Sequence, residues 1–176
     1  MEMRIELENM EDGRGNFAHT YQPEELNLID ERVRVTEPIS VNGRVRKSGS
    51  EVNVSGRVET RVNVECDRCL NTLEMPVSAG FKLQYITGQE YENSCATELT
   101  TDEMALSVFD GEAIDVDEIV REQILLSVPD HALCDENCRG ICSMCGTNLN
   151  AGSCECKSSE VDPRWAALRN FKNGEA

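Results

Sequence analysis

The sequence is poor in basic residues and in aromatic side chains. Its 176 residues include 17 lysines and arginines against 33 aspartates and glutamates, and the formal net charge is −16. Proteins bind nucleic acid chiefly through lysine and arginine, so this balance argues against a general nucleic-acid binder. It favours a basic protein as the partner, with any RNA contact confined to a local basic face.

Histidine and long apolar runs are also scarce, which limits the classes of function. His19 and His131 are the only histidines, and the chain shows neither a serine–histidine–acid set nor a glycine-rich phosphate-binding loop. We therefore expect a protein that is not an enzyme and that has no small-molecule substrate. No apolar run approaches the length of a membrane span, so we expect no membrane partner.

Cysteine, in contrast, is abundant, and the cysteines other than Cys95 follow a metal-binding pattern. One pair is C-x-x-C, and a later run is C-x3-C-x3-C-x2-C-x8-C-x-C. Four thiolates at such spacings can surround one Zn²⁺ tetrahedrally, so we predict two zinc ions. The start of the chain lacks the basic and apolar regions of an export peptide. We therefore expect a cytoplasmic, reducing compartment, where such cysteines bind metal. The predicted ligands are Cys66, Cys69, Cys134, Cys138, Cys142, Cys145, Cys154 and Cys156.

Two arrangements of these ligands fit the spacing. In the first, Cys66 and Cys69 join Cys134 and Cys138, and the remaining four cysteines form a compact local site. In the second, Cys134 and Cys138 complete the local site, and the last two cysteines of the run join the C-x-x-C pair. We favour the first arrangement because Cys134 and Cys138 directly follow a helix that should cover the sheet.

Other chemistries remain open for these thiols. Cys66 and Cys69 could form a redox dithiol or a metal-carrier site, although Arg68 between them and the absence of a thioredoxin-like βαβ pattern argue against it. An iron–sulfur cluster is compatible with the ligand type, but the Cys145-Gly146 knuckle favours zinc. His131 could replace one thiolate, but enough cysteines are present without it.

Residues 38–87 show the two-residue alternation of β-strands. The apolar positions of the first long strand alternate with polar ones up to Cys66, which should therefore be buried. Residues 47–50 predict a turn that pairs this strand with residues 41–46 as a hairpin. A third strand covers residues 73–85, and Pro76 within it indicates a sheet edge or a bulge. The alternating residues of the first long strand are Val52, Val54, Val58, Val62 and Val64.

Further along, the chain predicts a helix that ends at Val128 before Pro129. Asp115 or Asp117 can cap it, and its apolar stripe should face the sheet. We therefore predict an α+β fold, with a mainly antiparallel sheet or small open barrel and a covering helix over residues 1–129. A cysteine-rich zinc module with a C-terminal helix follows over residues 130–176. A strand is also expected at residues 4–7. The helical stripe consists of Val116, Ile119, Val120, Ile124 and Leu125.

Charge is distributed unevenly along the chain. Residues 83–120 contain ten acidic residues and no lysine or arginine, which predicts a solvated loop or an acidic docking surface for a basic protein. The hairpin carries the densest basic group, which could contact RNA phosphate or balance neighbouring carboxylates. Its members are Arg44, Arg46, Lys47, Arg57 and Arg61.

Several motifs together resemble the YceD family, the large ribosomal RNA subunit accumulation proteins. They span residues 64–168, and the C-x-R-C motif combined with the later cysteine run makes the resemblance specific. The matching segments are residues 64–70, 122–129, 133–142, 145–150 and 162–164.

The resemblance implies a factor needed for normal accumulation of large-subunit (23S) rRNA. Together with the acidity, it leads us to expect a non-enzymatic factor in large ribosomal subunit biogenesis. We expect this factor to act through contacts with a basic ribosomal protein or an assembly factor. The main alternatives are direct RNA binding through the face from Arg44 to Arg61 and thiol redox or metal-carrier chemistry at Cys66 and Cys69.

Overall fold

The computed structural model divides the chain into two compact units. The larger unit comprises Met1–Asp67 and Asn71–Cys134, and the smaller comprises Arg68–Leu70 and Asp135–Ala176. The structure describes residues 3–10, 13–94 and 106–156. Cys95 and residues 157–176, where the C-terminal helix is expected, lie outside the described residues.

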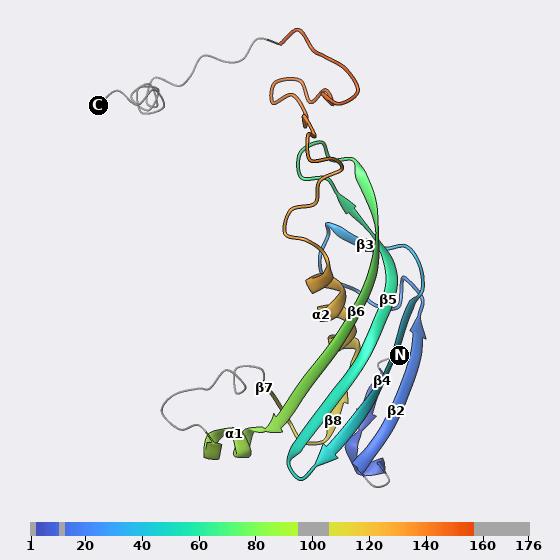
Figure 1. Cartoon of the computed structure of the whole chain (residues 1–176), viewed down its shortest axis with the longest axis vertical. Helices are drawn as coiled ribbons and strands as arrows, with labels where there is room; N and C mark the ends of the chain where they lie inside the picture. Colours follow the sequence, from blue (N-terminus) through green and yellow to red (C-terminus); the bar gives the residue numbers. More distant parts are fainter. Residues whose placement is uncertain (1–2, 11–12, 95–105, 157–176) are drawn as a thin grey trace, which may run out of the picture. The chain divides into compact units, whose positions relative to one another are not determined.

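Three long antiparallel strands form the centre of the larger unit (Figure 1). They are β4 (Ile39–Ser48), β5 (Glu51–Glu65) and β6 (Thr72–Thr87). The alternating valines of β5 are all buried, and Cys66 continues the same phase with no exposed surface. The predicted hairpin and third strand are therefore confirmed. Pro76 pairs with Arg61 in an unbroken register, and β7 joins β6 only at residues 84–87, so the proline lies at a sheet edge.

Shorter strands that the sequence did not reveal extend this sheet. β2 (Arg14–Tyr21) pairs antiparallel with β4, and β3 (Val33–Val35) pairs with the end of β5. β7 (Leu106–Phe109) adds a parallel pair on β6. The sheet is consequently mixed and open, in the order β2-β4-β5-β6-β7.

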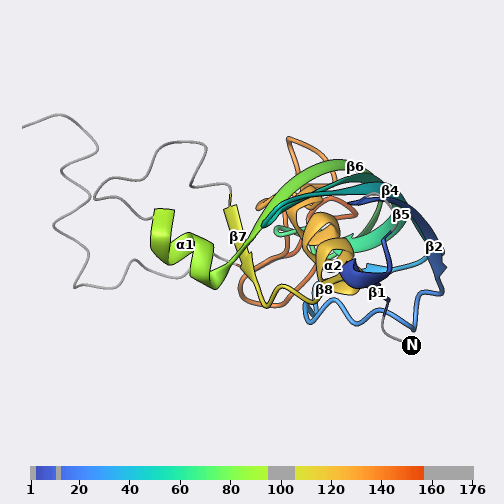
Figure 2. The same ribbon diagram turned by 90° about the horizontal axis from the view of Figure 1, so that it is seen from below.

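A helix fills the inner side of the curved sheet. α2 (Val116–Ser127) begins at Asp115, whose carboxylate accepts a hydrogen bond of 3.1 Å from the Glu118 backbone N–H, which confirms the expected cap. Figure 2 shows the sheet curving around α2. The helical residues that this packing buries are Val116, Ile119, Val120 and Ile124.

The N-terminal strand lies beside this helix. β1 (Arg4–Glu6) pairs with β8 (Ala113–Asp115) as a separate two-stranded sheet, which confirms a strand near residues 4–7. A single 3-10 turn (Leu7–Asn9) follows β1, and a short helix, α1 (Gly88–Ser94), follows β6. No helix among the described residues is long and apolar enough to cross a membrane.

Two glycines allow aromatic rings to lie directly on the sheet. A Cβ on Gly43 would stand 2.5 Å from the Phe17 ring, and one on Gly56 would stand 2.7 Å from the Phe81 ring. Gly43 and Gly56 face each other across β4 and β5, with Phe17 and Phe81 opposite them on the outer strands. Because both rings are buried, these glycines set how closely the core packs against the sheet.

Candidate metal centres and a basic sheet face

The structure gathers the eight predicted ligands into two groups of four. Cys66, Cys69, Cys134 and Cys138 form the first group, and their sulfur atoms all lie within 4.8 Å of one another. All except Cys134 are buried. The backbone N–H of Cys134 donates a hydrogen bond of 3.4 Å to Sγ of Cys66, an interaction that stabilises a thiolate.

Backbone hydrogen bonds position the two ligands that belong to the larger unit. The Asp67 N–H donates to the Ala132 carbonyl at 2.9 Å, and the Asp67 carboxylate accepts from the Ala132 N–H at 3.1 Å. This reciprocal pair holds the segment before Cys134 beside the residue that follows Cys66. His131, the alternative ligand, instead places Nδ1 3.3 Å from the Asp67 carboxylate.

In the smaller unit, Arg68 organises the chain around Cys138. Its Nη1 donates hydrogen bonds to the carbonyls of Cys138 at 3.0 Å and Glu136 at 3.2 Å. Its own carbonyl accepts from the Ile141 N–H at 3.0 Å. Gly140 has a φ of +73°, and a Cβ there would stand 2.9 Å from the Arg68 carbonyl oxygen. The arginine of the C-x-R-C motif thus serves a structural purpose in this unit.

The second group lies entirely in the smaller unit. The sulfurs of Cys142, Cys145, Cys154 and Cys156 also lie within 4.8 Å of one another. The Cys142 N–H donates to the Thr147 carbonyl at 2.9 Å, and the Gly146 N–H donates to the Cys142 carbonyl at 2.8 Å. These bonds close a tight knuckle, in which Gly146 adopts a φ of +73° that glycine tolerates best.

Hydrogen bonds within the second group shift the pKa values of its thiols in opposite directions. The hydroxyl of Thr147, 3.1 Å from Sγ of Cys145, lowers the pKa of Cys145 to about 6. The hydrogen bond that Cys156 makes with Cys145 raises the pKa of Cys156 to about 12. Such opposed shifts are expected where several thiols crowd together, because one ionises early and its negative charge makes the next harder to ionise.

The sulfur separations in both groups are compatible with a tetrahedral metal ion. Sulfurs about 2.3 Å from a central Zn²⁺ stand about 3.8 Å apart, and the sulfurs of each group lie no more than 4.8 Å from one another. The two clusters could therefore each hold a metal ion. Their membership corresponds to the first of the two arrangements considered from the spacing, with Cys134 and Cys138 beside Cys66 and Cys69.

A basic face occupies the outer side of the sheet in the larger unit. Three consecutive cross-strand rows there contain five cations and no carboxylate. The two rows that contain Arg46 and Arg44 border a hollow of about 930 Å³. We call this the basic sheet face, and its cations are Arg14, Arg44, Arg46, Arg57 and Lys82.

The basic sheet face differs from the group proposed from the sequence. Lys47 shares the phase of the buried Val45 and thus projects from the opposite side of β4. Arg61 shares the phase of Arg57 but already contacts Glu37 at 3.3 Å and Glu74 at 2.9 Å. Arg14 and Lys82 were missed, because only the register places them beside the hairpin arginines. Neither forms an ion pair within the described residues.

Known proteins share this chain's sequence pattern. The family model described as "Large ribosomal RNA subunit accumulation protein YceD" matches residues 54–172. An uncharacterized protein of Mycobacterium leprae is 31% identical over 135 residues, 76% of this chain and 59% of that protein. The uncharacterized protein YlbN of Bacillus subtilis is 26% identical, with 88% of this chain and 86% of that protein covered.

A plant relative carries a functional name. It is the "Large ribosomal RNA subunit accumulation protein YCED homolog 1, chloroplastic" of Arabidopsis thaliana, 25% identical over 77% of this chain and 49% of that protein. The matched region thus spans less than two thirds of the mycobacterial and plant relatives. No solved structure matches the chain significantly. Because the family model covers more than half of its residues, the chain belongs to the YceD family.

Proposed function

We propose that this protein is a non-enzymatic factor in large ribosomal subunit biogenesis that contacts rRNA phosphates through the basic sheet face. The name of its plant relative, large ribosomal RNA subunit accumulation protein, supports a role in large ribosomal subunit biogenesis. The observation that carries the RNA contact is the row arrangement, which places five cations on one exposed face without a carboxylate among them.

The local positive charge of this face matters more for RNA binding than the net charge of the chain. A chain of net charge −16 repels RNA over most of its surface. A phosphate at the basic sheet face, however, interacts mainly with the nearest charges, because salt screens the distant ones. Amide side chains of Asn16, Asn42 and Asn53 stand in the same rows and offer further donors to phosphate and sugar oxygens.

We also propose that the two cysteine groups hold Zn²⁺ as structural ions. Four thiolates complete the tetrahedral coordination of zinc and leave no position for a water or substrate, which agrees with a non-enzymatic function. Redox or carrier chemistry at Cys66 and Cys69 is disfavoured, because both thiols are buried, with at most 4% of their surface exposed, and thiol exchange requires access.

The RNA contact can be tested with neighbouring residues of one strand. Arg44→Glu/Arg46→Glu should weaken binding to a large-subunit rRNA transcript about tenfold or more, because two phosphate contacts become repulsive. Lys47→Glu, on the opposite side of the same strand, should have a much smaller effect. The wild type should show a slope of log affinity against log salt of about −3.5 for five contacts with single-stranded RNA. Equal losses in both variants, or no binding by the wild type, would refute the contact.

A further inference from the structure

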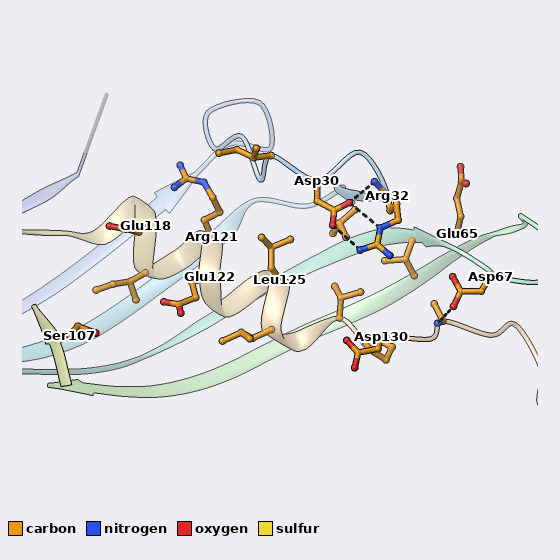
Figure 3. Close-up of a pocket in the computed structure, with 18 of the residues that line it drawn as sticks. Asp30, Arg32, Glu65, Asp67, Ser107, Glu118, Arg121, Glu122, Leu125 and Asp130 are labelled. Carbon is orange, nitrogen blue, oxygen red and sulfur yellow. Dashed lines mark hydrogen bonds and ion pairs between the residues drawn. The ribbon is translucent and has the colours of Figure 1, made fainter. Parts of the chain in front are cut away.

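The larger unit contains a second hollow, on the side of the sheet where α2 lies. It measures about 810 Å³ and runs along α2 between residues 29–32 and the end of β5. We call it the α2 groove. Figure 3 shows Glu118, Arg121 and Glu122 of α2 along it, with Asp30 and Asp67 on the segments that border it.

Apolar side chains are exposed in this groove. Ile29 is 80% exposed, Leu126 is 72% exposed and Val108 is 52% exposed, and all three line it. Only one other large hydrophobic side chain, Leu133, is exposed in the described part of the larger unit. Such a concentration of exposed apolar surface is typical of an interaction site.

Carboxylates surround the apolar side chains. The groove is lined by six carboxylates and two guanidinium groups, and both guanidinium groups are already bound. Arg32 contacts Asp30 at 3.1 Å, and Nε of Arg121 donates to the Asn27 carbonyl at 2.8 Å. The carboxylates that form no ion pair with any described residue are Glu65, Glu118, Glu122 and Asp130.

The negative charge reaches into the groove. Tyr85 lines it, and its burial, followed by the nearby carboxylates of Glu122 and Glu118, raises its pKa to about 12. RNA phosphates are repelled by such a rim. A second copy of this chain would bring the same acidic groove and a net charge of −16, so it also fits poorly.

We infer that the α2 groove docks a lysine- or arginine-rich amphipathic segment of a protein partner. Its apolar side chains would cover Ile29, Val108 and Leu126, and its cations would pair with the unpaired carboxylates, the arrangement of an amphipathic helix in a groove. The assignment of this partner to the large ribosomal subunit rests on the proposed function. The docking chemistry rests only on the apolar and acidic residues of the groove.

The test uses a labelled synthetic peptide with leucines at helical i, i+3 and i+4 spacing and lysines elsewhere, titrated with the full chain. Glu122→Lys/Asp130→Lys should lower its affinity at least about tenfold, because rim attraction becomes repulsion. Leu126→Ser should lower the affinity about tenfold without any change of charge. The matched control, Glu24→Lys/Glu59→Lys, makes the same charge change at exposed residues outside the groove and should retain binding.

Several results would overturn the docking site. These are no peptide binding by the wild type, equal losses in the control variant, or unchanged binding in Leu126→Ser. Loss of rRNA binding in the groove variants would assign the groove to RNA. A wild-type dimer that Leu126→Ser dissociates in sedimentation would assign it to a second copy. Groove-dependent peptide binding without any rRNA binding would refute the proposed RNA contact while supporting the docking site.

Discussion

The hydroxyl of Tyr21 donates a hydrogen bond of 2.7 Å to Oδ1 of Asp117, a residue 96 positions later in the chain. The same oxygen accepts a bond of 3.1 Å from the Met3 N–H, and the Val116 N–H donates to the Met3 carbonyl at 3.0 Å. One carboxylate therefore ties the start of α2 to strand β2 and to the N-terminal segment. This junction adds polar contacts to the apolar packing that holds α2 on the sheet.

Tyr21→Phe should lower the free energy of unfolding by about 2 kcal/mol, because it leaves a carboxylate without one of its donors. Urea denaturation monitored by circular dichroism measures the change. Tyr85→Phe is the matched control, because burial and nearby carboxylates, and no hydrogen bond, account for the raised pKa of Tyr85. Tyr85→Phe should therefore lower the free energy of unfolding by less than Tyr21→Phe. Asp117→Asn keeps an acceptor oxygen and should retain more stability than Asp117→Ala. A Tyr21→Phe variant as stable as the wild type would contradict this account.

Alkaline pH should destabilise the larger unit. Burial, followed by the hydrogen bond to Asp117, raises the pKa of Tyr21 well above its usual value near 10, and burial raises that of Tyr85 to about 12. Above pH 10 the unfolded chain therefore loses phenolic protons that the folded chain retains. The unfolded state then binds fewer protons, so the free energy of unfolding falls as pH rises. The stability that the two protonated tyrosines contribute is fully present below pH 10 and is lost as the pH rises toward their raised pKa values.

Denaturation curves between pH 9 and 12 measure this dependence, with absorbance of the phenolate as an independent readout. The double variant Tyr21→Phe/Tyr85→Phe should show a shallower decline over the same range. An equally steep decline in the double variant would show that other groups are responsible.

Native mass spectrometry should find two zinc ions per chain. Cys66→Ser and Cys142→Ser should each reduce the count to one, because each removes a ligand from a different group. Structural zinc sites can contribute about 10 kcal/mol to folding, so chelation should unfold the segment around each site. A count of two in either variant would contradict the grouping of the ligands, and a metal-free, stably folded wild type would contradict the zinc assignment itself.

Gly140 and Gly146 offer a paired test of the smaller unit. Both have a φ of +73°, but only at Gly140 would a Cβ crowd another residue, namely the Arg68 carbonyl oxygen at 2.9 Å. Gly146→Ala should cost about 1 kcal/mol for backbone strain alone. Gly140→Ala should cost more and should release zinc faster to a chelator. Equal effects of the two substitutions would show that the Arg68 contact contributes nothing.

The parts of the fold that were predictable from the sequence are those with one buried face. The valines of β5 and the stripe of α2 repeat with the periods of a strand and a helix, so their phases were visible. β2 was missed because its buried residues, Phe17 and Tyr21, lie in a mostly polar stretch. β7 pairs in parallel after a long connection, and no local pattern reveals such a partner.

The candidate sites show the same division between local and distant information. Cysteine spacing was sufficient to propose eight ligands, but spacing alone allowed two arrangements. The basic sheet face was only partly predictable, because Lys47 is near Arg46 in sequence but faces the other side. Arg14 and Lys82 are distant in sequence and become neighbours only through strand register.

β5 places severe limits on changes of chain length. A single inserted or deleted residue between Val54 and Val64 would turn the following side chains to the other face of the sheet. The valines beyond the change would be exposed, and the thiol of Cys66 would point away from Cys134. Two residues could be added together without this inversion, and the Gly49-Ser50 turn could accept one. Length variation among natural versions of this protein should therefore concentrate in the turn and avoid the strand.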